Sequence, residues 1–530
     1  MRNTHFPGRS VVMGTRAMAA TSQPLATHTA LDVLRGGGNA LDAAIAAAAV
    51  LGVVEPYSTS IGGDCFLFYH EAASDRLHAL NGSGWASQAA TPDAYFARGC
   101  KNAIPATGIL SVTVPGAIDA WCTAHEKFGR TGFAQLLQPA IHFAEQGFAV
   151  APVVAANWQR SVEQLRATPD AARTYLRDGC APLAGSMHRQ PALASTLKLI
   201  AEGGRDAFYQ GSIAERIVRF SDSLGGLLSL DDFAEFRSQW VKPISTVYRD
   251  HRIFEIPPNG QGIAVLMALN FLTQSNVADL QHLGAGHVHL LAEAFSMAIA
   301  ERDRFVSDQE FAKLPVDELL GEKFARLQWQ RFDADHALPQ PMMSAFPNHA
   351  DTVYLTVVDE DRNACSFINS TFSAWGSGLV AGDTGISLQN RGSGFVLEAG
   401  HFNCVAPRKR PLHTIIPAMV YRDDRPVLSF GVMGGHYQAM GHTYFMSNWL
   451  DFGLDLQEAL DAPRFMLYEK ELRVEQGVPA ETCQRLQSLG HNLVAVEKPL
   501  GGGQVIFIDW QNGTLHGASD PRKDGCALGY

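Results

Sequence analysis

Thr352 is the residue whose type and position point most directly to covalent chemistry. It follows a stretch rich in proline and polar residues, 338–351, and opens the run 352–359, which is rich in the β-branched and aromatic residues typical of a strand. If the chain is cut between Asp351 and Thr352, the threonine gains a free α-amine that can take the proton of its own hydroxyl. Such an amine has an ordinary pKa of about 7.7–8.0, so part of it is neutral at pH 7. An Asp-Thr pair by itself is also a common way to start a strand.

A second candidate lies about eighty residues further on. The expected strand 426–432 leads into Gly434 and Gly435, and a helix is expected over 437–450. Backbone N–H groups exposed between a strand and a helix suit a developing oxyanion. A simple packing turn explains the same pattern, so the glycines leave both interpretations open.

The elements that must position these residues form a mixed pattern of helices and strands. The segments 352–359 and 364–372 are expected to pair as a hairpin, and 505–517 as a second hairpin that turns at Asn512-Gly513. Further strands are expected within 11–20, 65–69, 244–257, 384–388 and 415–421. Helices are expected over 27–35, 40–52 with Asn39 as N-cap, 116–128, 133–147, 191–203, 211–224, 262–272 and 287–305.

Composition excludes several classes of protein. The chain has 530 residues and a mass of 57.4 kDa, which is too long for one ordinary domain. Its net charge of −11 without a long basic block argues against a nucleic-acid partner. No secretory signal opens the sequence, and the most apolar run, 43–54, is too short to span a bilayer. We therefore expect a cytoplasmic protein without a membrane segment.

No metal or organic cofactor is expected. The eight cysteines are scattered without a CxxC pair, so the sequence predicts neither a zinc site nor a disulfide framework. His287 and His289 stand two residues apart on an expected helix and so do not share a face. The triplet at 36–38 lacks the rest of a phosphate-binding loop.

Several ordered motifs together resemble the γ-glutamyltransferase family of N-terminal-nucleophile (Ntn) hydrolases. They span nearly the whole chain and comprise GGGNALDAA at 36–44, GVVEP at 52–56, IGG at 61–63, KRPL at 409–412, MGG at 433–435 and GASDPR at 517–522. The resemblance implies an α+β fold, a four-layer αββα sandwich, and self-cleavage before Thr352. It also implies that a large chain, 1–351, and a small catalytic chain, 352–530, stay together as one unit.

The resemblance assigns the catalytic roles. It makes Thr352 the nucleophile and gives the oxyanion hole to Gly434 and Gly435. Ser370 matches a hydroxyl residue that bonds the amine or the hydroxyl of the nucleophile.

Other positions depart from the γ-glutamyl pattern. The arginine that holds the substrate carboxylate in the family falls on Ser83, and the aspartate that holds the ammonium falls on Gly394. A supporting asparagine falls on Phe372. Two serines that touch the carboxylate fall on His413 and Thr414. Loss of both charged anchors should weaken glutamyl recognition by several kcal/mol, at about 1.5–3 kcal/mol per charged hydrogen bond.

Arg391, beside Asn390, is gained near the lost aspartate position. Its guanidinium can bind a carboxylate bidentately, with His413 and Thr414 assisting. Phe372 and Trp85 would narrow the pocket. The sequence therefore looks more similar to the family branch that hydrolyses oxamate in purine breakdown.

Four interpretations stay open at this level. The first is a hydrolase of small carboxylate-bearing amides, with oxamate the best candidate. The second is a γ-glutamyl hydrolase or transferase acting on glutathione-like substrates, and the third an inactive family member that serves as a binding protein. In the fourth, Arg391 only makes a structural salt bridge. The sequence leaves the oligomeric state undecided, a homodimer included.

Overall fold

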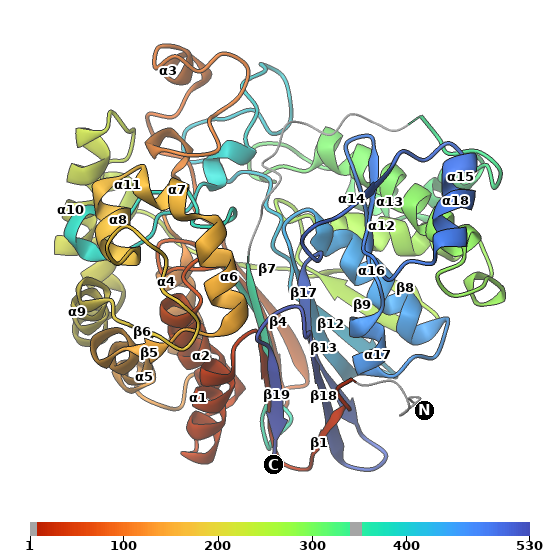
Figure 1. Cartoon of the computed structure of the whole chain (residues 1–530), viewed down its shortest axis with the longest axis horizontal. Coiled ribbons are helices and arrows are strands. Elements are labelled where there is room, and N and C mark those ends of the chain that lie inside the picture. The colour runs from red at the N-terminus through yellow and green to blue at the C-terminus, as the bar shows by residue number, and fades with distance from the viewer. Residues whose placement is uncertain (1–7, 340–351) are drawn as a thin grey trace.

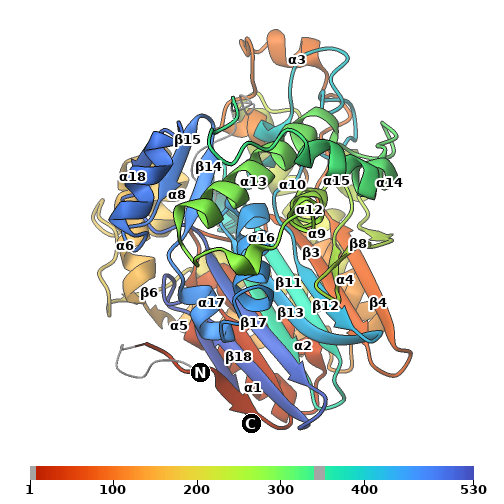
Figure 2. The ribbon, with the colours of Figure 1, turned by 90° about the vertical axis from the view of Figure 1, so that its right-hand side faces the viewer.

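The protein is built on two seven-stranded antiparallel sheets that face each other between two layers of helices (Figures 1 and 2). This computed structural model describes residues 8–339 and 352–530. Asp351, on the amino side of the predicted cleavage, lies outside the described residues. The predicted α+β, four-layer αββα sandwich is confirmed.

The first sheet, here called the nucleophile sheet, holds the hairpin that begins next to Thr352. Its strand order is β19 (Cys526–Gly529), β2 (Met18–Thr21), β10 (Val353–Val358), β11 (Ala364–Ser370), β3 (Asp64–Glu71), β4 (Arg76–Gly82) and β7 (Gln239–Val241).

The second sheet, here called the glycine sheet, contains the strand that ends just before the Gly434-Gly435 turn. Its order is β1 (Val12–Gly14), β18 (Thr514–Ser519), β17 (Gly502–Asp509), β13 (Arg425–Met433), β12 (Ala418–Arg422), β9 (His251–Glu255) and β8 (Ile244–Tyr248).

Helices cover the outer face of each sheet (Figure 1). The nucleophile sheet packs against α1 (Pro24–Arg35), α2 (Ala40–Val54), α4 (Ala117–Phe128), α5 (Phe133–Gln146) and α9 (Pro191–Tyr209). The glycine sheet packs against α12 (Gly262–Leu272), α13 (Ala285–Phe305), α16 (Tyr437–Leu450) and α17 (Leu456–Asp461).

Smaller elements surround these layers. The helices are α3 (Pro92–Phe96), α6 (Pro152–Arg160), α7 (Val162–Arg166), α8 (Pro169–Tyr175), α10 (Ser212–Ser223), α11 (Leu230–Ala234), α14 (Val316–Leu319), α15 (Glu322–Trp329) and α18 (Ala480–Ser488). One small sheet pairs β5 (Phe148–Ala149) with β6 (Met187–His188). Another small sheet contains β14 (Phe465–Tyr468), β15 (Glu471–Val474) and β16 (Leu493–Ala495).

Helix α2 shows how the sequence builds the outer layer. All of its residues are buried, as its apolar sequence predicts, and its many alanines let neighbouring elements approach closely. Asn39 accepts a hydrogen bond from the backbone N–H of Asp42, whose side chain accepts one from the N–H of Asn39. This capping box starts the helix where the sequence predicts it.

Strand β10 shows how the nucleophile is aimed. Its alternate residues Val353, Leu355 and Val357 pack into the helical core, whereas Tyr354 and Val358 belong to the core between the sheets. Because side chains alternate along a strand, Thr352 falls on the side that faces the glycine sheet.

Two strand predictions were wrong. Residues 384–388 form only single bridges, Gly62 with Leu388 and Val380 with Ser387. Gly385 has a φ of 71°, which interrupts extended backbone there. Segment 11–20 splits into β1 and β2, which belong to different sheets, so one apolar run serves two layers.

Candidate active site

The β10–β11 hairpin places Thr352 beside Ser370. Val353 pairs with Asn369, so the residue before β10 lies next to the last residue of β11. The Thr352 Oγ1 and Ser370 Oγ atoms are 3.0 Å apart, and both side chains are buried. The Ser370 hydroxyl also accepts a hydrogen bond from the backbone N–H of Phe372, at 2.9 Å. A sequence separation of 18 residues is thus closed by one hairpin.

Arg391 lies against this pair of hydroxyls. Its Nη2 is 3.5 Å from Ser370 Oγ, and its Nη1 donates to Thr414 Oγ1 at 2.9 Å. The guanidinium carbon stands 4.0 Å from the centre of the Phe372 ring, a cation–π contact. Phe372 has a φ of 79°, in the left-handed region that residues other than glycine rarely adopt, so the chain turns at the residue whose ring contacts the arginine.

The charge of Arg391 is buried without an ion pair. The side chain is fully buried, and its Nε has no hydrogen-bond partner. No carboxylate of residues 8–339 or 352–530 lies within salt-bridge distance of the guanidinium. Burial lowers the pKa of Arg391 to about 9, an effect that the more distant carboxylate of Asp64 opposes. The group is therefore cationic at neutral pH, and the structural salt bridge considered from sequence is not found.

His413, which the sequence places at the substrate carboxylate, has both ring nitrogens engaged within the chain. Its Nε2 donates to Asp64 Oδ2 at 2.9 Å, and its Nδ1 accepts from the backbone N–H of Ile415 at 3.3 Å. Burial and the nearby Arg391 charge lower the pKa of His413 to about 4, so the ring is neutral. With both nitrogens engaged, this histidine serves to hold Asp64.

Asn390 is also committed within the chain. Its Nδ2 donates to the carbonyl oxygen of Ala106 at 2.6 Å and to Ser373 Oγ at 2.9 Å. Its Oδ1 accepts from the N–H of Ser373 at 3.0 Å. The amide therefore fixes the loop that carries Arg391.

Asp64 is a residue of this cluster that the sequence did not single out. Besides His413, its carboxylate accepts from the backbone N–H groups of Gly84 and Gly116 and from the side-chain amide of Gln389, at 2.8–3.1 Å. A carboxylate at the start of an otherwise apolar strand was the available signal, because such a group needs partners when it is buried.

The Gly434-Gly435 turn follows β13 with φ values of 115° and 58°. Neither backbone N–H of these two glycines has an acceptor among the residues that the structure describes. The Gln261 side-chain amide ties this turn to the cluster, because its Nε2 donates to the carbonyl oxygens of Thr414, at 2.7 Å, and Gly435, at 2.9 Å. Arg302 in turn donates to Gln261 Oε1 at 2.7 Å.

Ser83 and Trp85 lie in other networks. Ser83 Oγ accepts from Asn259 Nδ2 at 3.0 Å, and the Ser83 carbonyl accepts from Arg410 Nε at 3.1 Å. Trp85 donates to the carbonyl of Asp232 and packs edge-on against Phe236. These contacts give no support to the predicted part of Trp85 in narrowing the pocket.

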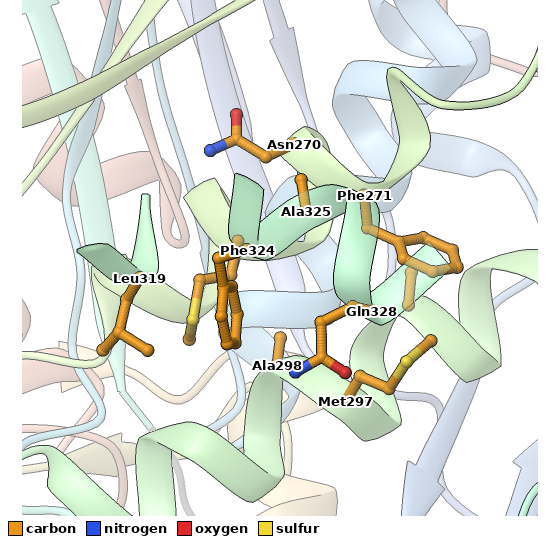
Figure 3. Close-up of a pocket in the computed structure, with 10 residues that line it drawn as sticks. Asn270, Phe271, Met297, Ala298, Leu319, Phe324, Ala325 and Gln328 are labelled. Carbon is orange, nitrogen blue, oxygen red and sulfur yellow. The ribbon is translucent and has the colours of Figure 1, made fainter. Parts of the chain in front are cut away.

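Two cavities among the described residues lie away from this cluster. Figure 3 shows one of about 10 Å³, lined by side chains of α12, α13 and α15 such as Phe271, Met297 and Gln328. A larger hollow of about 630 Å³ lies beside α6 and residues 521–524. Neither is lined by Thr352, Ser370 or Arg391, whose side chains are packed together in the uncut chain.

Comparison with known proteins assigns the family. The model of the gamma-glutamyltranspeptidase family matches residues 26–530. The chain belongs to this family. A glutathione hydrolase-like YwrD proenzyme of Bacillus subtilis (strain 168) is 38% identical over 98% of this chain and 99% of its own length. An oxamate amidohydrolase proenzyme of Klebsiella pneumoniae is 34% identical over 98% of this chain and 99% of its own length.

A solved structure of a cephalosporin acylase from Bacillus halodurans has the same fold as this family member. It superposes with a TM-score of 0.93 at 39% identity, covering 99% of this chain and 98% of the other. The relatives are hydrolases and acylases, so this chain is an amidohydrolase of the family. Within residues 8–339 and 352–530, no helix has the length and apolar character needed to cross a bilayer.

Proposed function

We propose that the protein is a self-processing amidohydrolase whose chain is cut between Asp351 and Thr352. The Thr352 hydroxyl then attacks the carbonyl carbon of an amide, and its own α-amine takes the proton. The N–H groups of Gly434 and Gly435 hold the oxyanion. Collapse of that intermediate releases ammonia or an amine and leaves an acyl group on Thr352. Water then attacks the acyl carbonyl, which frees the acid and restores the hydroxyl.

The substrate in this proposal is a small amide that carries a carboxylate. The buried Arg391 carries this part of the proposal, because its cation lies beside the Thr352–Ser370 pair without a carboxylate partner among the described residues. An unpaired buried charge is costly, and an anionic ligand that pairs with it offsets that cost. Thr414 can add a hydroxyl hydrogen to the same carboxylate, because its Oγ1 already accepts from Arg391.

Oxamate is the best candidate of this class. It places a carboxylate directly beside the amide, and a site with one guanidinium close to the nucleophile suits so short a molecule. The products would be oxalate and ammonia. The 34% identity to an oxamate amidohydrolase proenzyme supports the choice.

A γ-glutamyl hydrolase or transferase is the second candidate. It is favoured by the 38% identity to the glutathione hydrolase-like proenzyme and by 31% identity to a glutathione hydrolase proenzyme of Escherichia coli (strain K12). Against it stands the absence of charged groups at Ser83 and Gly394, where the family pattern places its two anchors. An inactive binding protein is disfavoured by the close Thr352–Ser370 contact.

Turnover of two compounds by the processed enzyme tests the proposal. Oxamate and a γ-glutamyl anilide are assayed side by side, for released ammonia and released aniline. We expect turnover of oxamate and at most slow turnover of the anilide. Turnover of the anilide alone would transfer the assignment to the γ-glutamyl class, and no turnover of either by a correctly cut protein would refute both.

A further inference from the structure

Three side chains that bind metals in many proteins meet far from Thr352. His289 and Glu293 lie one turn apart on α13, and His491 follows α18 in the turn that leads to β16. All three are buried, with at most 4% exposure. Helices α13 and α18 pack together (Figure 2), which brings the two histidines into contact over a separation of 202 residues.

The distances are close to those of a metal site. His289 Nδ1 lies 2.8 Å from His491 Nε2, and Glu293 Oε1 lies 4.0 Å from each of these nitrogens. A tetrahedral zinc ion at about 2.0–2.2 Å from its ligands separates them by about 3.4 Å. The distance between the two nitrogens is shorter than that value, and the two distances to Glu293 are longer. Shifts of the ligand atoms by less than about 1 Å would therefore complete the geometry.

The hydrogen bond on the far side of His289 fixes its tautomer. Its Nε2 is 2.8 Å from the carbonyl oxygen of Asp333, which can only accept. Nε2 therefore carries the hydrogen, and Nδ1 accepts the hydrogen of His491 Nε2, which a metal ion bound between the two nitrogens would displace. A histidine whose other nitrogen donates to a backbone carbonyl is the arrangement that orients imidazole ligands in metal sites.

Glu293 is the second, independent observation. Neither of its carboxylate oxygens makes a hydrogen bond of ordinary geometry with the described residues. The backbone N–H of Leu338 approaches the carboxyl without reaching that geometry. A buried carboxyl so poorly supplied with donors is rare in folded proteins, and a bound cation is one of the things that explain it.

We propose that His289, Glu293 and His491 bind a single divalent transition-metal ion of the zinc class. Two imidazole nitrogens and one carboxylate oxygen form a donor set that favours Zn²⁺ and its neighbours over Mg²⁺ or Ca²⁺. The sequence predicts no metal site, because the neighbouring pair His287 and His289 does not share a helix face and His491 is distant in the sequence. As expected, these two histidines face different surroundings, since His287 packs against His282 and Phe452.

The ion would have a structural role. It joins α13 to the segment after α18, and it does not contact the cluster around Thr352. If the chain is cut as proposed above, His289 and Glu293 belong to the large chain and His491 to the small one. The ion would then tie the two chains together, and this consequence rests on the proposed processing, whereas the site itself does not.

Metal content tests the proposal directly. The protein, without a histidine tag, is purified from cells grown with added zinc salt, desalted, and analysed by elemental mass spectrometry. We expect about one ion per chain in the wild type and at least about a tenfold lower content in Glu293→Gln, which keeps the shape of the side chain and removes a ligand. His336→Ala is the matched control, because it removes an exposed imidazole that is not a ligand, and it should keep the ion.

Two outcomes would overturn the site: wild-type protein without stoichiometric metal, or a Glu293→Gln variant that retains it. Because the amide of that variant can still accept from the backbone N–H of Leu338, a drop in metal content with unchanged thermal unfolding of metal-free protein separates ligation from misfolding. The uncut Thr352→Ala precursor should bind the ion equally well. Metal bound by a wild type that is not cut would uphold the site while refuting the proposed processing.

Discussion

At the scale of single residues, two buried hydroxyls and one buried cation form the candidate active site. Thr352 and Ser370 lie within hydrogen-bonding distance, and Arg391 contacts the Ser370 side. A threonine hydroxyl needs a base, and in this arrangement the base arises only when the chain is cut before the threonine. In the proposed mechanism, cleavage and catalysis therefore depend on the same side chain.

Replacing that side chain should stop both events. We predict that Thr352→Ala remains a single chain without amidase activity, because neither the cut nor the acyl-enzyme can form. Thr352→Ser retains a hydroxyl and should be cut, although more slowly. Intact mass under denaturing conditions distinguishes the two variants, and two chains in Thr352→Ala would show that another residue starts the cleavage.

The pH dependence of substrate capture should report on Arg391. Burial lowers its pKa to about 9, so the cation that binds an anionic substrate is present below that pH and is lost as the pH rises through it. We predict that kcat/KM for oxamate falls above about pH 9 by about tenfold per pH unit, since this ratio reflects the free enzyme. A profile that stays level well above pH 9 would show that burial does not lower the pKa of Arg391 to this range in the cut enzyme.

At the scale of elements, Asp64 joins several loops to the start of β3. Its carboxylate holds the N–H groups of Gly84 and Gly116, the amide of Gln389 and the ring of His413. Removing it leaves the Gly84 N–H and the His413 ring N–H without an acceptor, whereas Gly116 and Gln389 each keep another one.

We predict that Asp64→Ala lowers the free energy of unfolding by about 3–5 kcal/mol, which denaturant titration measures. Glu163→Ala, at a side chain that is 86% exposed, should change it by less than about 0.5 kcal/mol. A small effect at Asp64 would mean that water or a shifted loop replaces the carboxylate.

Local patterns predicted the elements near the nucleophile well. The alternation of residues 352–372 gives the β10–β11 hairpin, and helix α16 begins and ends where its pattern predicts. The contact between Thr352 and Ser370 follows from that hairpin alone.

Contacts between distant loops could not be predicted in this way. The pairing of Asp64 with His413 spans 349 residues, and that of His289 with His491 spans 202. Asn390 and His413 were therefore assigned to the substrate although neighbouring loops occupy their polar atoms. The lack of an ion pair at Arg391 could not be predicted either, because only the assembled fold shows which carboxylates stay out of its reach.

At the scale of the whole molecule, the segments before and after Thr352 are interleaved in both sheets. In the nucleophile sheet, β2 lies between β19 and β10, and in the glycine sheet β9 pairs with β12 while β1 pairs with β18. A cut before Thr352 therefore separates no layer of the sandwich from another.

We predict that the two chains of the cut protein stay together. They should elute as one species of at least 57.4 kDa in native buffer and separate only under denaturing conditions. Separating the two chains would leave strands unpaired within both sheets and would expose the core between the sheets. Spontaneous dissociation of the chains in native buffer would contradict the interleaved arrangement.

Arg391 is proposed to select a substrate carboxylate next to the scissile amide. The most direct measurement compares oxamate with oxamide, in which a neutral amide replaces the carboxylate, on wild-type protein and on Arg391→Gln. We predict that the wild type prefers oxamate in kcat/KM by about 100-fold or more, and that most of this preference disappears in the variant, as expected for a lost buried charge interaction of about 3 kcal/mol. A variant that is cut normally and keeps the full preference for oxamate would show that another group reads the carboxylate.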